Sequence, residues 1–226
     1  MKIAIVVPVF NEALALPRLI EHLAALKATA NQDFELVFVD GGSTDDTMAL
    51  LDDAGLRVIT STKGRAWQMN AGAAQTTGDI LLFLHADTQL PVNALEAIPS
   101  SLAGNMCWGR FDVRIAGKTW MLAVVANMMN WRSRLSGIAT GDQAIFMTRA
   151  AFQAIGGFPE QALMEDIEAS RRLRQLSRPA CISAQVITSG RRWETRGVWR
   201  TIFLMWRLRW SYWRGQSPIK LAELYA

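Results

Sequence analysis

The fold is decided by one stretch, Gly78-Asp79-Ile80-Leu81-Leu82-Phe83-Leu84-His85-Ala86-Asp87-Thr88. Its apolar run, bounded by a Gly-Asp pair and a polar cluster, predicts a strand buried on both faces, as at the centre of a parallel sheet. Open α/β sheets bind ligands beyond the carboxyl ends of their strands, where His85 and Asp87 stand two residues apart. A carboxylate there suits a divalent cation held against a phosphate; a polar turn is the alternative for Asp87 alone.

Strands and helices alternate before this stretch. Strands are predicted at residues 3–10, 34–39 and 57–60. Asn11 is expected to cap a leucine-rich helix, Ser43 or Thr44 to cap the next one, and a small-residue helix is expected at residues 66–75. Because strands and helices alternate at this spacing, the sequence predicts an α/β fold with a doubly wound, mostly parallel sheet flanked by helices.

The second half of the chain is less regular. Its predicted elements are an edge or antiparallel strand at 110–115, a helix at 120–131, a strand at 143–148, and helices at 165–176 and 198–213. Repeats, low-complexity tracts and evident linkers are absent from the sequence. We therefore expect one catalytic domain at residues 1–190 and an amphipathic, basic helical extension at residues 191–226.

The composition indicates in which cellular compartment the protein is expected. The 226 residues are half hydrophobic, with nine Trp and ten Met, and the net charge of +4 conceals an Arg-rich end after residue 171. Cys107 and Cys181 lack metal or redox spacing, which favours reduced cysteines in a cytoplasmic protein. Pro8, Asn11 and Glu12 interrupt an N-terminus that otherwise resembles a signal peptide. No run reaches the roughly 20 apolar residues that span a bilayer.

Charged residues are expected to gather at the carboxyl edge of the sheet. Glu12, Asp40 and Asp87 each follow a strand, and Lys63 and Arg65 follow the third one. Carboxylates can bind a nucleoside and a metal, while cations meet phosphate oxygens, so the set suits a nucleoside diphosphate. Turn formation is the alternative role for Asp40. The G-x-G-x-x-G and P-loop spacings are both missing.

Three motifs together resemble family-2 glycosyltransferases of the GT-A fold, in a small bacterial uncharacterised branch. They are Pro8-Val9-Phe10-Asn11-Glu12, Asp40-Gly41-Gly42-Ser43-Thr44-Asp45, and Gly78-Asp79 leading to His85-Ala86-Asp87. The resemblance implies a nucleotide diphosphate sugar as donor, with Mg²⁺ or Mn²⁺ bound by Asp87. Nucleotide contacts are expected from Pro8, Phe10, Glu12, Asp40, Lys63, Arg65, His85 and Ala86.

The same resemblance implies that Asp166 is the base that deprotonates an acceptor hydroxyl. It would act opposite the leaving group, so that the displacement is in line and inverts the sugar. Asp142 and Glu165 are candidate acceptor contacts. Acidic residues at a helix start also complement the helix dipole, and this is the alternative role for Glu165 and Asp166.

Two departures from the family pattern bear on function. His85 replaces the first carboxylate of the usual Asp-x-Asp motif; we expect it to bond to ribose or backbone, whereas a nitrogen ligand to the metal would favour Mn²⁺. Only Arg191-Arg192-Trp193 stands where processive members carry Gln-x-x-Arg-Trp. Transfer of a single sugar is therefore expected.

The last predicted helix carries two stripes. Trp199, Trp206, Trp210 and Trp213 recur at helical spacing beside an arginine every seven residues. Aromatic rings next to arginines fit an anionic membrane surface, which would make the protein peripheral on the inner face of the cell membrane and its acceptor lipid-linked. Docking on the catalytic domain or in a homodimer is the alternative. No nucleic-acid motif occurs.

The leading functional hypothesis is thus a metal-dependent inverting glycosyltransferase. A nucleotidyltransferase that makes an activated sugar is the second hypothesis, and pyrophosphate as its product would reveal it. A catalytically silent, membrane-associated nucleotide-binding module is the third, and it would not hydrolyse a donor.

Overall fold

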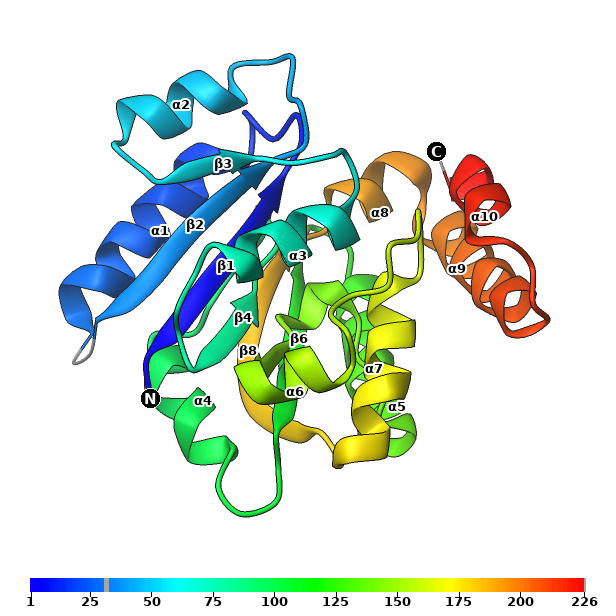
Figure 1. Ribbon diagram of the computed structural model, residues 1–226. Helices are drawn as coiled ribbons and strands as arrows, with labels where there is room; N and C mark the ends of the chain where they lie inside the picture. The colour runs from blue at the N-terminus through cyan, green and yellow to red at the C-terminus, as the bar shows by residue number, and fades with distance from the viewer. Residues whose placement is uncertain (31–32, 226) are drawn as a thin grey trace.

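The computed structural model describes residues 1–30 and 33–225. In this part of the chain, eight strands form one sheet with the order β3-β2-β1-β4-β7-β6-β8-β5 (Figure 1). The strands are β1 (Ile3–Val9), β2 (Phe34–Asp40), β3 (Val58–Thr60), β4 (Ile80–Phe83), β5 (Thr88–Gln89), β6 (Trp108–Ala116), β7 (Phe146–Thr148) and β8 (Ala180–Ser189). β1, β2, β3 and β4 run parallel to their neighbours within this group. The predicted mostly parallel, doubly wound sheet is confirmed.

Helices cover both faces of the sheet. One face packs against α1 (Leu16–Thr29), α2 (Thr47–Asp53), α4 (Ala94–Ser101) and α5 (Met121–Ser136). The other face packs against α3 (Arg65–Ala74), α6 (Arg149–Ala154) and α7 (Glu165–Leu176). Both sides of β1 are therefore covered, and all seven of its residues are buried. This explains why an unbroken apolar run, rather than an alternating one, forms the strand.

The central stretch is a shorter strand than its sequence predicts. β4 ends at Phe83, so His85 and Asp87 lie in the connection that leads to β5. β4 pairs with β1 on one side and antiparallel with β7 on the other. The carboxyl end of β4 therefore lies at the boundary between the parallel strands β1 to β4 and the strands β5 to β8, which include antiparallel pairs.

The strand predicted at residues 110–115 is not an edge strand. β6 lies between β7, to which it is antiparallel, and β8, to which it is parallel. Its alternation arises because Asp112 and Arg114 are less buried than the apolar residues between them. The predicted strand at residues 143–148 is likewise shorter, because Gly141–Gln143 forms a 3-10 turn, η1, before β7.

The expected helix caps are wrong. Asn11, with φ of 53°, does not cap α1; its Oδ1 accepts from the Thr44 N–H at 2.8 Å. Ser43 lies before α2, and its Oγ accepts from the Asn11 N–H at 2.9 Å. The Glu12 N–H in turn donates to Thr47 Oγ1 at 2.9 Å. These side chains bond across two loops instead, and so tie the segment after β1 to the segment after β2.

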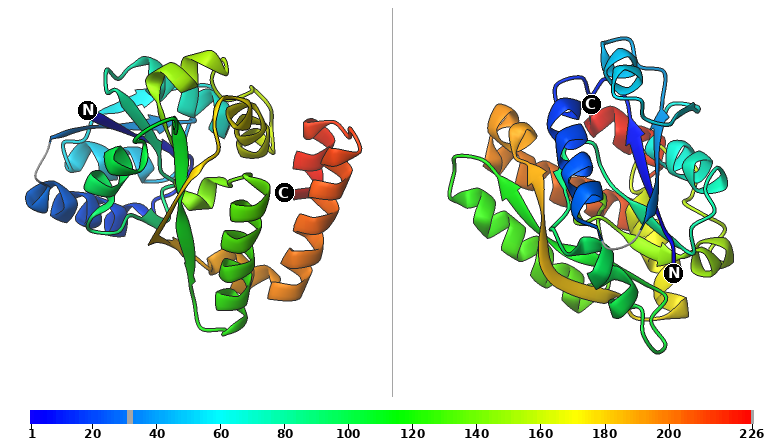
Figure 2. Two further views of the ribbon diagram at one scale, coloured as in Figure 1. Left: turned by 90° about the horizontal axis from the view of Figure 1, so that it is seen from below. Right: turned by 90° about the vertical axis from the view of Figure 1, so that its left-hand side faces the viewer.

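In the described part of the chain after β8, the helices are α8 (Arg191–Arg196), α9 (Val198–Trp213) and α10 (Pro218–Tyr225). Leu208 and Leu221 from α9 and α10 are buried with Leu163 and Met164. Figure 2 shows α9 and α10 lying along the body on the side of α5 and α7. Among the described residues, no helix has the length and apolar character needed to cross a bilayer.

Candidate functional site

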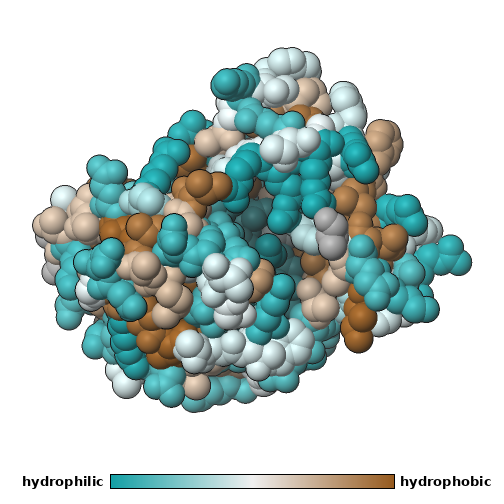
Figure 3. Space-filling model, turned by 90° about the horizontal axis from the view of Figure 1, so that it is seen from above, coloured by the Kyte–Doolittle hydropathy of each residue, from teal (hydrophilic) through white to brown (hydrophobic). Residues whose placement is uncertain are grey.

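A cavity of about 650 Å³ opens beyond the carboxyl ends of β1 and β4. It lies between the sheet on one side and helices α5, α8 and α9 on the other. From the sheet side it is lined by Pro8, Glu12, Arg65, His85, Ala86, Asp87, Asp142, Glu165 and Asp166. Figure 3 views this edge of the molecule and shows a hollow with a hydrophilic lining. The structure thus brings nine of the twelve predicted site residues into one cavity.

Three of the predicted residues lie outside the cavity lining. The Asp40 carboxylate is buried and accepts the Gly42 N–H at 2.8 Å and the Ser43 hydroxyl at 2.5 Å, so it shapes the turn after β2. The Lys63 ammonium lies 3.9 Å from the centre of the Phe10 ring. All three side chains flank the loops after β1, β2 and β3, on the side of the cavity where a nucleoside is expected.

His85 is held against η1. Its Nδ1 lies 3.4 Å from Asp142 Oδ1, and Gly141 allows the approach, because a Cβ at that position would overlap the imidazole ring. Enclosure disfavours the charged Asp142 carboxylate, but the hydrogen bond and charge of His85, followed by Arg65, outweigh this and lower the pKa of Asp142. Asp142 therefore lies against His85, whereas Asp87 forms no ion pair with any described residue.

Glu12 and Asp87 form a pair of neighbouring carboxylates. Burial, and then the charge of Asp87, raise the pKa of Glu12. The Glu12 Oε2 atom is buried without a hydrogen-bond partner among the described residues, and Arg191 Nη2 lies 3.8 Å from it, beyond hydrogen-bond distance. Asp87 Oδ1 accepts from the Thr88 hydroxyl at 3.3 Å. A cation or a hydrogen-bond donor placed between these oxygens would relieve the repulsion.

These oxygens fit a divalent cation that is shared with a substrate. Within residues 1–30 and 33–225, no three His, Cys, Asp or Glu side chains converge as a complete metal cage. Mg²⁺ is commonly bound through one or two carboxylates, with substrate phosphates and water completing its shell. Asp87, together with the unpartnered oxygen of Glu12, would supply this kind of partial site.

Arg65 stands at the centre of the acidic residues. Its Nη1 lies 3.8 Å from Glu165 Oε1. Enclosure would lower the pKa of Arg65, but the charges of Glu165, Asp142, Asp166 and Asp87 raise it instead. Burial, and then the charge of Asp166, raise the pKa of Glu165. A single guanidinium therefore compensates carboxylates from both the metal side and the α7 side of the cavity.

Asp166 is oriented by main-chain groups. Its Oδ2 accepts the Gly141 N–H at 2.9 Å, and its Oδ1 accepts the Ile167 N–H at 2.7 Å. Met164, with φ of 68°, turns the chain sharply before α7 begins. Glu165 is consequently buried while Asp166 is half-buried and faces the cavity.

Several residues of the site were not predicted from the sequence. Gln68 Nε2 donates to the main-chain oxygens of Val9 and Val39, both at 2.7 Å, and so fixes the ends of β1 and β2. Arg132 on α5 and Arg209 on α9 line the cavity opposite the sheet. Gln68 could have been predicted, because a glutamine on the buried face of a small-residue helix needs hydrogen-bond partners. Arg132 and Arg209 could not, because no local sequence pattern shows that α5 and α9 lie opposite each other.

Known proteins resemble this chain in sequence and fold. The sequence profile described as Glycosyl transferase family 2 matches residues 4–150. The undecaprenyl-phosphate 4-deoxy-4-formamido-L-arabinose transferase of Enterobacter sp. (strain 638) is 34% identical over 110 residues, which are 45% of this chain and 33% of that protein. The homologous protein of Klebsiella pneumoniae (strain 342) is 33% identical over 98 residues. The chain thus matches about a third of the length of these curated relatives.

Solved structures share the fold. Mannosyltransferase PcManGT from Pyrobaculum calidifontis, in complex with GDP-Man and Mn²⁺, superposes with a TM-score of 0.66 at 18% identity, over 100% of this chain and 69% of that one. S. aureus TarS 1-349 in complex with UDP-GlcNAc gives a TM-score of 0.63 at 18% identity, over 84% of this chain and 58% of that one. These likenesses confirm the expected GT-A fold. Because the family profile matches well over half of its residues, the chain belongs to glycosyl transferase family 2.

Proposed function

We propose that the protein transfers a single sugar from a nucleotide diphosphate sugar to an acceptor, with inversion at the sugar carbon. The observation that carries the proposal is the placing of Asp87 and Asp166 in one cavity, with Arg65 among their carboxylates. One carboxylate can hold a cation against the diphosphate, and the other can remove a proton from the acceptor. Membership of glycosyl transferase family 2 supports this division of roles.

The donor would bind along the loops after β1, β2 and β3. Asp40 and Glu12 would contact the nucleoside. Lys63 and Arg65 would contact the phosphates. A bound Mg²⁺ or Mn²⁺ would act as a Lewis acid on the leaving diphosphate. Arg65 would stabilise the same developing charge by a contact that strengthens as the bond breaks.

The acceptor would enter from the side of α5 and α9. In the transfer step, the acceptor oxygen forms a bond to the anomeric carbon while the bond to the donor phosphate breaks and the nucleoside diphosphate leaves. Asp166 takes the hydroxyl proton, so charge and atoms balance. The main-chain bonds from Gly141 and Ile167 would fix the direction in which its carboxylate points.

A donor screen tests this function. Nucleotide sugars are added with Mn²⁺, and the melting temperature is recorded, because a ligand that binds only the folded state stabilises it by mass action. We expect one donor class to raise the melting temperature, and that donor to release a nucleoside diphosphate when an acceptor or water reacts. Release of pyrophosphate would identify a nucleotidyltransferase. A bound donor that remains intact with every acceptor would identify a silent nucleotide-binding module.

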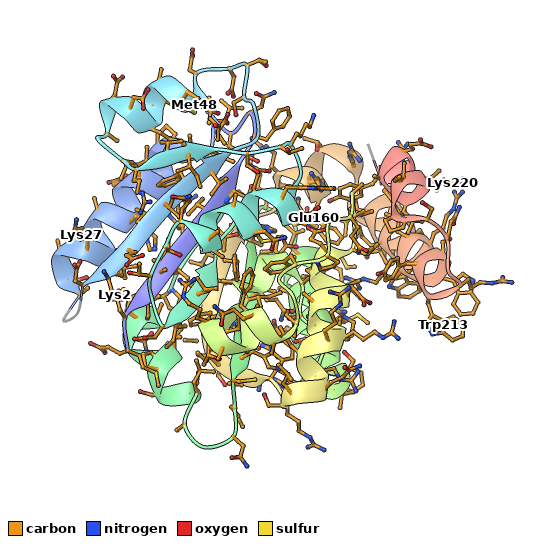
Figure 4. All side chains as sticks on the ribbon, viewed as in Figure 1. Lys2, Lys27, Met48, Glu160, Trp213 and Lys220 are labelled. Carbon is orange, nitrogen blue, oxygen red and sulfur yellow. The ribbon has the colours of Figure 1, made fainter. Side chains whose placement is uncertain are left out.

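We also propose that the protein is peripheral on the cytoplasmic face of the cell membrane, with residues 191–226 as its membrane-facing extension and a lipid-linked acceptor. Two stripes of exposed apolar side chains flank the cavity, one on α5 and one on α9. They comprise Trp120 just before α5 and Met128, Trp131 and Leu135 on it, and Trp199, Phe203, Trp206, Trp210 and Trp213 on α9. Trp213 projects away from the body in Figure 4. The first curated relatives are named for undecaprenyl phosphate, a lipid.

Anionic liposomes test the membrane surface. We expect cosedimentation that weakens as salt screens the arginines of α9 and that is lost when Trp199, Trp206 and Trp213 are replaced by Ser together. Neutral liposomes at the same lipid concentration are the control. Absence of cosedimentation, or its indifference to this triple change, would contradict the proposal. A dimer detected by light scattering and abolished by the same change would instead identify the stripe as an interface between copies.

A further inference from the structure

Two arginines on the proposed acceptor side of the cavity carry buried N–H groups that lack hydrogen-bond partners among the described residues. The Nε and Nη2 atoms of Arg132 and the Nε atom of Arg209 are buried, and none has a hydrogen-bond acceptor among the described residues. Both side chains line the cavity, Arg132 from the last turns of α5 and Arg209 from the last turns of α9. Buried guanidinium N–H groups are normally satisfied, because leaving them unpaired costs free energy.

The two guanidinium groups also repel each other. Burial, and then the charge of Arg209, lower the pKa of Arg132 from its usual value to about 10. Burial lowers the pKa of Arg209 as well. Asp166 lines the same cavity and is the first carboxylate whose charge opposes these shifts at both residues. A second negative charge near the pair would stabilise it further.

Other arginines of the cavity are already engaged. Arg191 lies near Glu12, Arg192 stacks with its Cζ 4.6 Å from the centre of the Tyr225 ring, and Arg196 Nη1 donates to the Tyr225 main-chain oxygen at 2.8 Å. These residues close the wall formed by α8 and α10. Arg132 and Arg209 therefore differ from these arginines, because their buried N–H groups meet no acceptor in the described part of the chain.

The surroundings of the pair are apolar. Met128 and Met129 from α5, and Met205 and Trp206 from α9, line the same cavity. Met128 and Trp206 are also exposed, so the apolar lining continues to the surface. A ligand that fills this part of the cavity would carry an anionic group at the arginines and an apolar body leading outwards between the two helices.

We propose that Arg132 and Arg209 form an anion-binding subsite that holds a phosphate monoester of the acceptor. The proposal rests on the transferase function proposed above, and it adds the chemical class of the acceptor. A phosphate monoester presents several oxygens to two guanidinium groups and forms charge-assisted hydrogen bonds with them. Asp166 borders the subsite, so the bound acceptor would reach the reacting position.

Binding of octyl phosphate tests the subsite without any donor. Octyl phosphate has the expected head group on a short apolar chain, and the fluorescence of Trp131 and Trp206 would report its entry. We expect Arg132→Gln and Arg209→Gln each to weaken binding by about 10–100-fold, the scale of hydrogen bonds to charged groups. Arg207→Gln, on the same helix and exposed, is the matched control and should bind octyl phosphate as the unchanged protein does.

Two further ligands identify the source of the anion. Inorganic phosphate that binds as tightly as octyl phosphate would indicate a water-soluble phosphate monoester, whereas much tighter binding of octyl phosphate would indicate a lipid phosphate. Octanol binding as tightly as octyl phosphate would overturn the proposal, because the anion would then contribute nothing. Unchanged octyl phosphate binding in both glutamine variants would overturn it equally.

Folding and donor binding are measured in parallel. Each glutamine substitution removes one of two repelling buried charges, so the melting temperature should hold or rise; Arg132→Lys keeps the charge and provides a second variant. Loss of UDP or GDP binding in place of octyl phosphate binding would assign the pair to the donor and overturn the proposal. The two proposals can also fail separately. If the protein transfers no sugar but still binds octyl phosphate through these arginines, the subsite proposal holds and the transferase proposal fails.

Discussion

Asp166→Asn should reduce sugar transfer by about 10²–10⁴-fold, the usual scale for the loss of a general base. Donor affinity should change little, because in the proposed mechanism Asp166 contacts the acceptor and not the donor. The measurement is single-turnover transfer to a confirmed acceptor, with donor affinity determined by calorimetry. An amide keeps one accepting oxygen, so one of the two main-chain bonds from Gly141 and Ile167 can persist.

Glu168→Gln is the matched control. It lies on the first turn of the same helix, and its carboxylate bonds to Arg172 at 3.2 Å outside the cavity. Turnover retained in Asp166→Asn would remove the residue from the role, leaving Glu165 as the next candidate. Retained turnover is also the result expected if the reacting oxygen belongs to a phosphate, since an oxygen that is already anionic requires no base. Lost donor binding would mean that the carboxylate holds the donor or the structure of the site.

Asp87→Ala should abolish the effect of metal on donor binding while the fold survives. Asp87 is the carboxylate of the His85-Ala86-Asp87 turn and forms no ion pair within residues 1–30 and 33–225, although its charge acts on Arg65. In the proposed site it is the principal protein ligand of Mg²⁺ or Mn²⁺. Burial, and after it the charge of Asp87, raise the pKa of Glu12. The substitution removes the second of these effects, so the melting temperature without ligands should not fall. Calorimetry with the donor, in the presence and absence of Mn²⁺, measures the expected loss.

Asp53→Ala, an exposed carboxylate on α2, provides the comparison for Asp87→Ala. It should leave metal-dependent binding at the level of the unchanged protein. A titration of Asp87→Ala that matches that of the unchanged protein would remove Asp87 from the metal site. Glu12, whose Oε2 atom is buried and unpartnered, would then be the residue to replace next.

Much of the fold could be predicted because its determinants are local. The runs that form β1 and β2 are apolar throughout, and the predicted helices at residues 165–176 and 198–213 coincide with α7 and α9. β8 was not predicted, because Ala180–Ser189 mixes small, polar and apolar residues, and only three of them are buried. What makes this segment a strand is its neighbour β6, and such pairing leaves no local periodicity.

The candidate site divides in a similar way. Motif residues such as Glu12 and Asp87 reach one cavity because each follows a strand of the same sheet. The hydrogen bond by which Asn11 connects two loops was not predicted, because its partner, Thr44, lies 33 residues away in the sequence. The roles of Arg132 and Arg209 in the cavity were not predicted for the same reason. In the sequence each resembles a surface residue of its own helix, and only the packing of α5 near α9 brings them into one cavity.

The ties between the loops after β1 and β2 bear on how donor choice can change. Asn11 and Ser43 bond to one another's loop, and Gln68 clamps the ends of both strands. The nucleoside would therefore meet a template that is already assembled, and little ordering entropy would be lost on binding. Such a template would select one nucleoside over another by the fixed shape of its two loops. Altered base selectivity would then require coordinated exchange of both loops, since replacing either one alone would remove the partners that position the other.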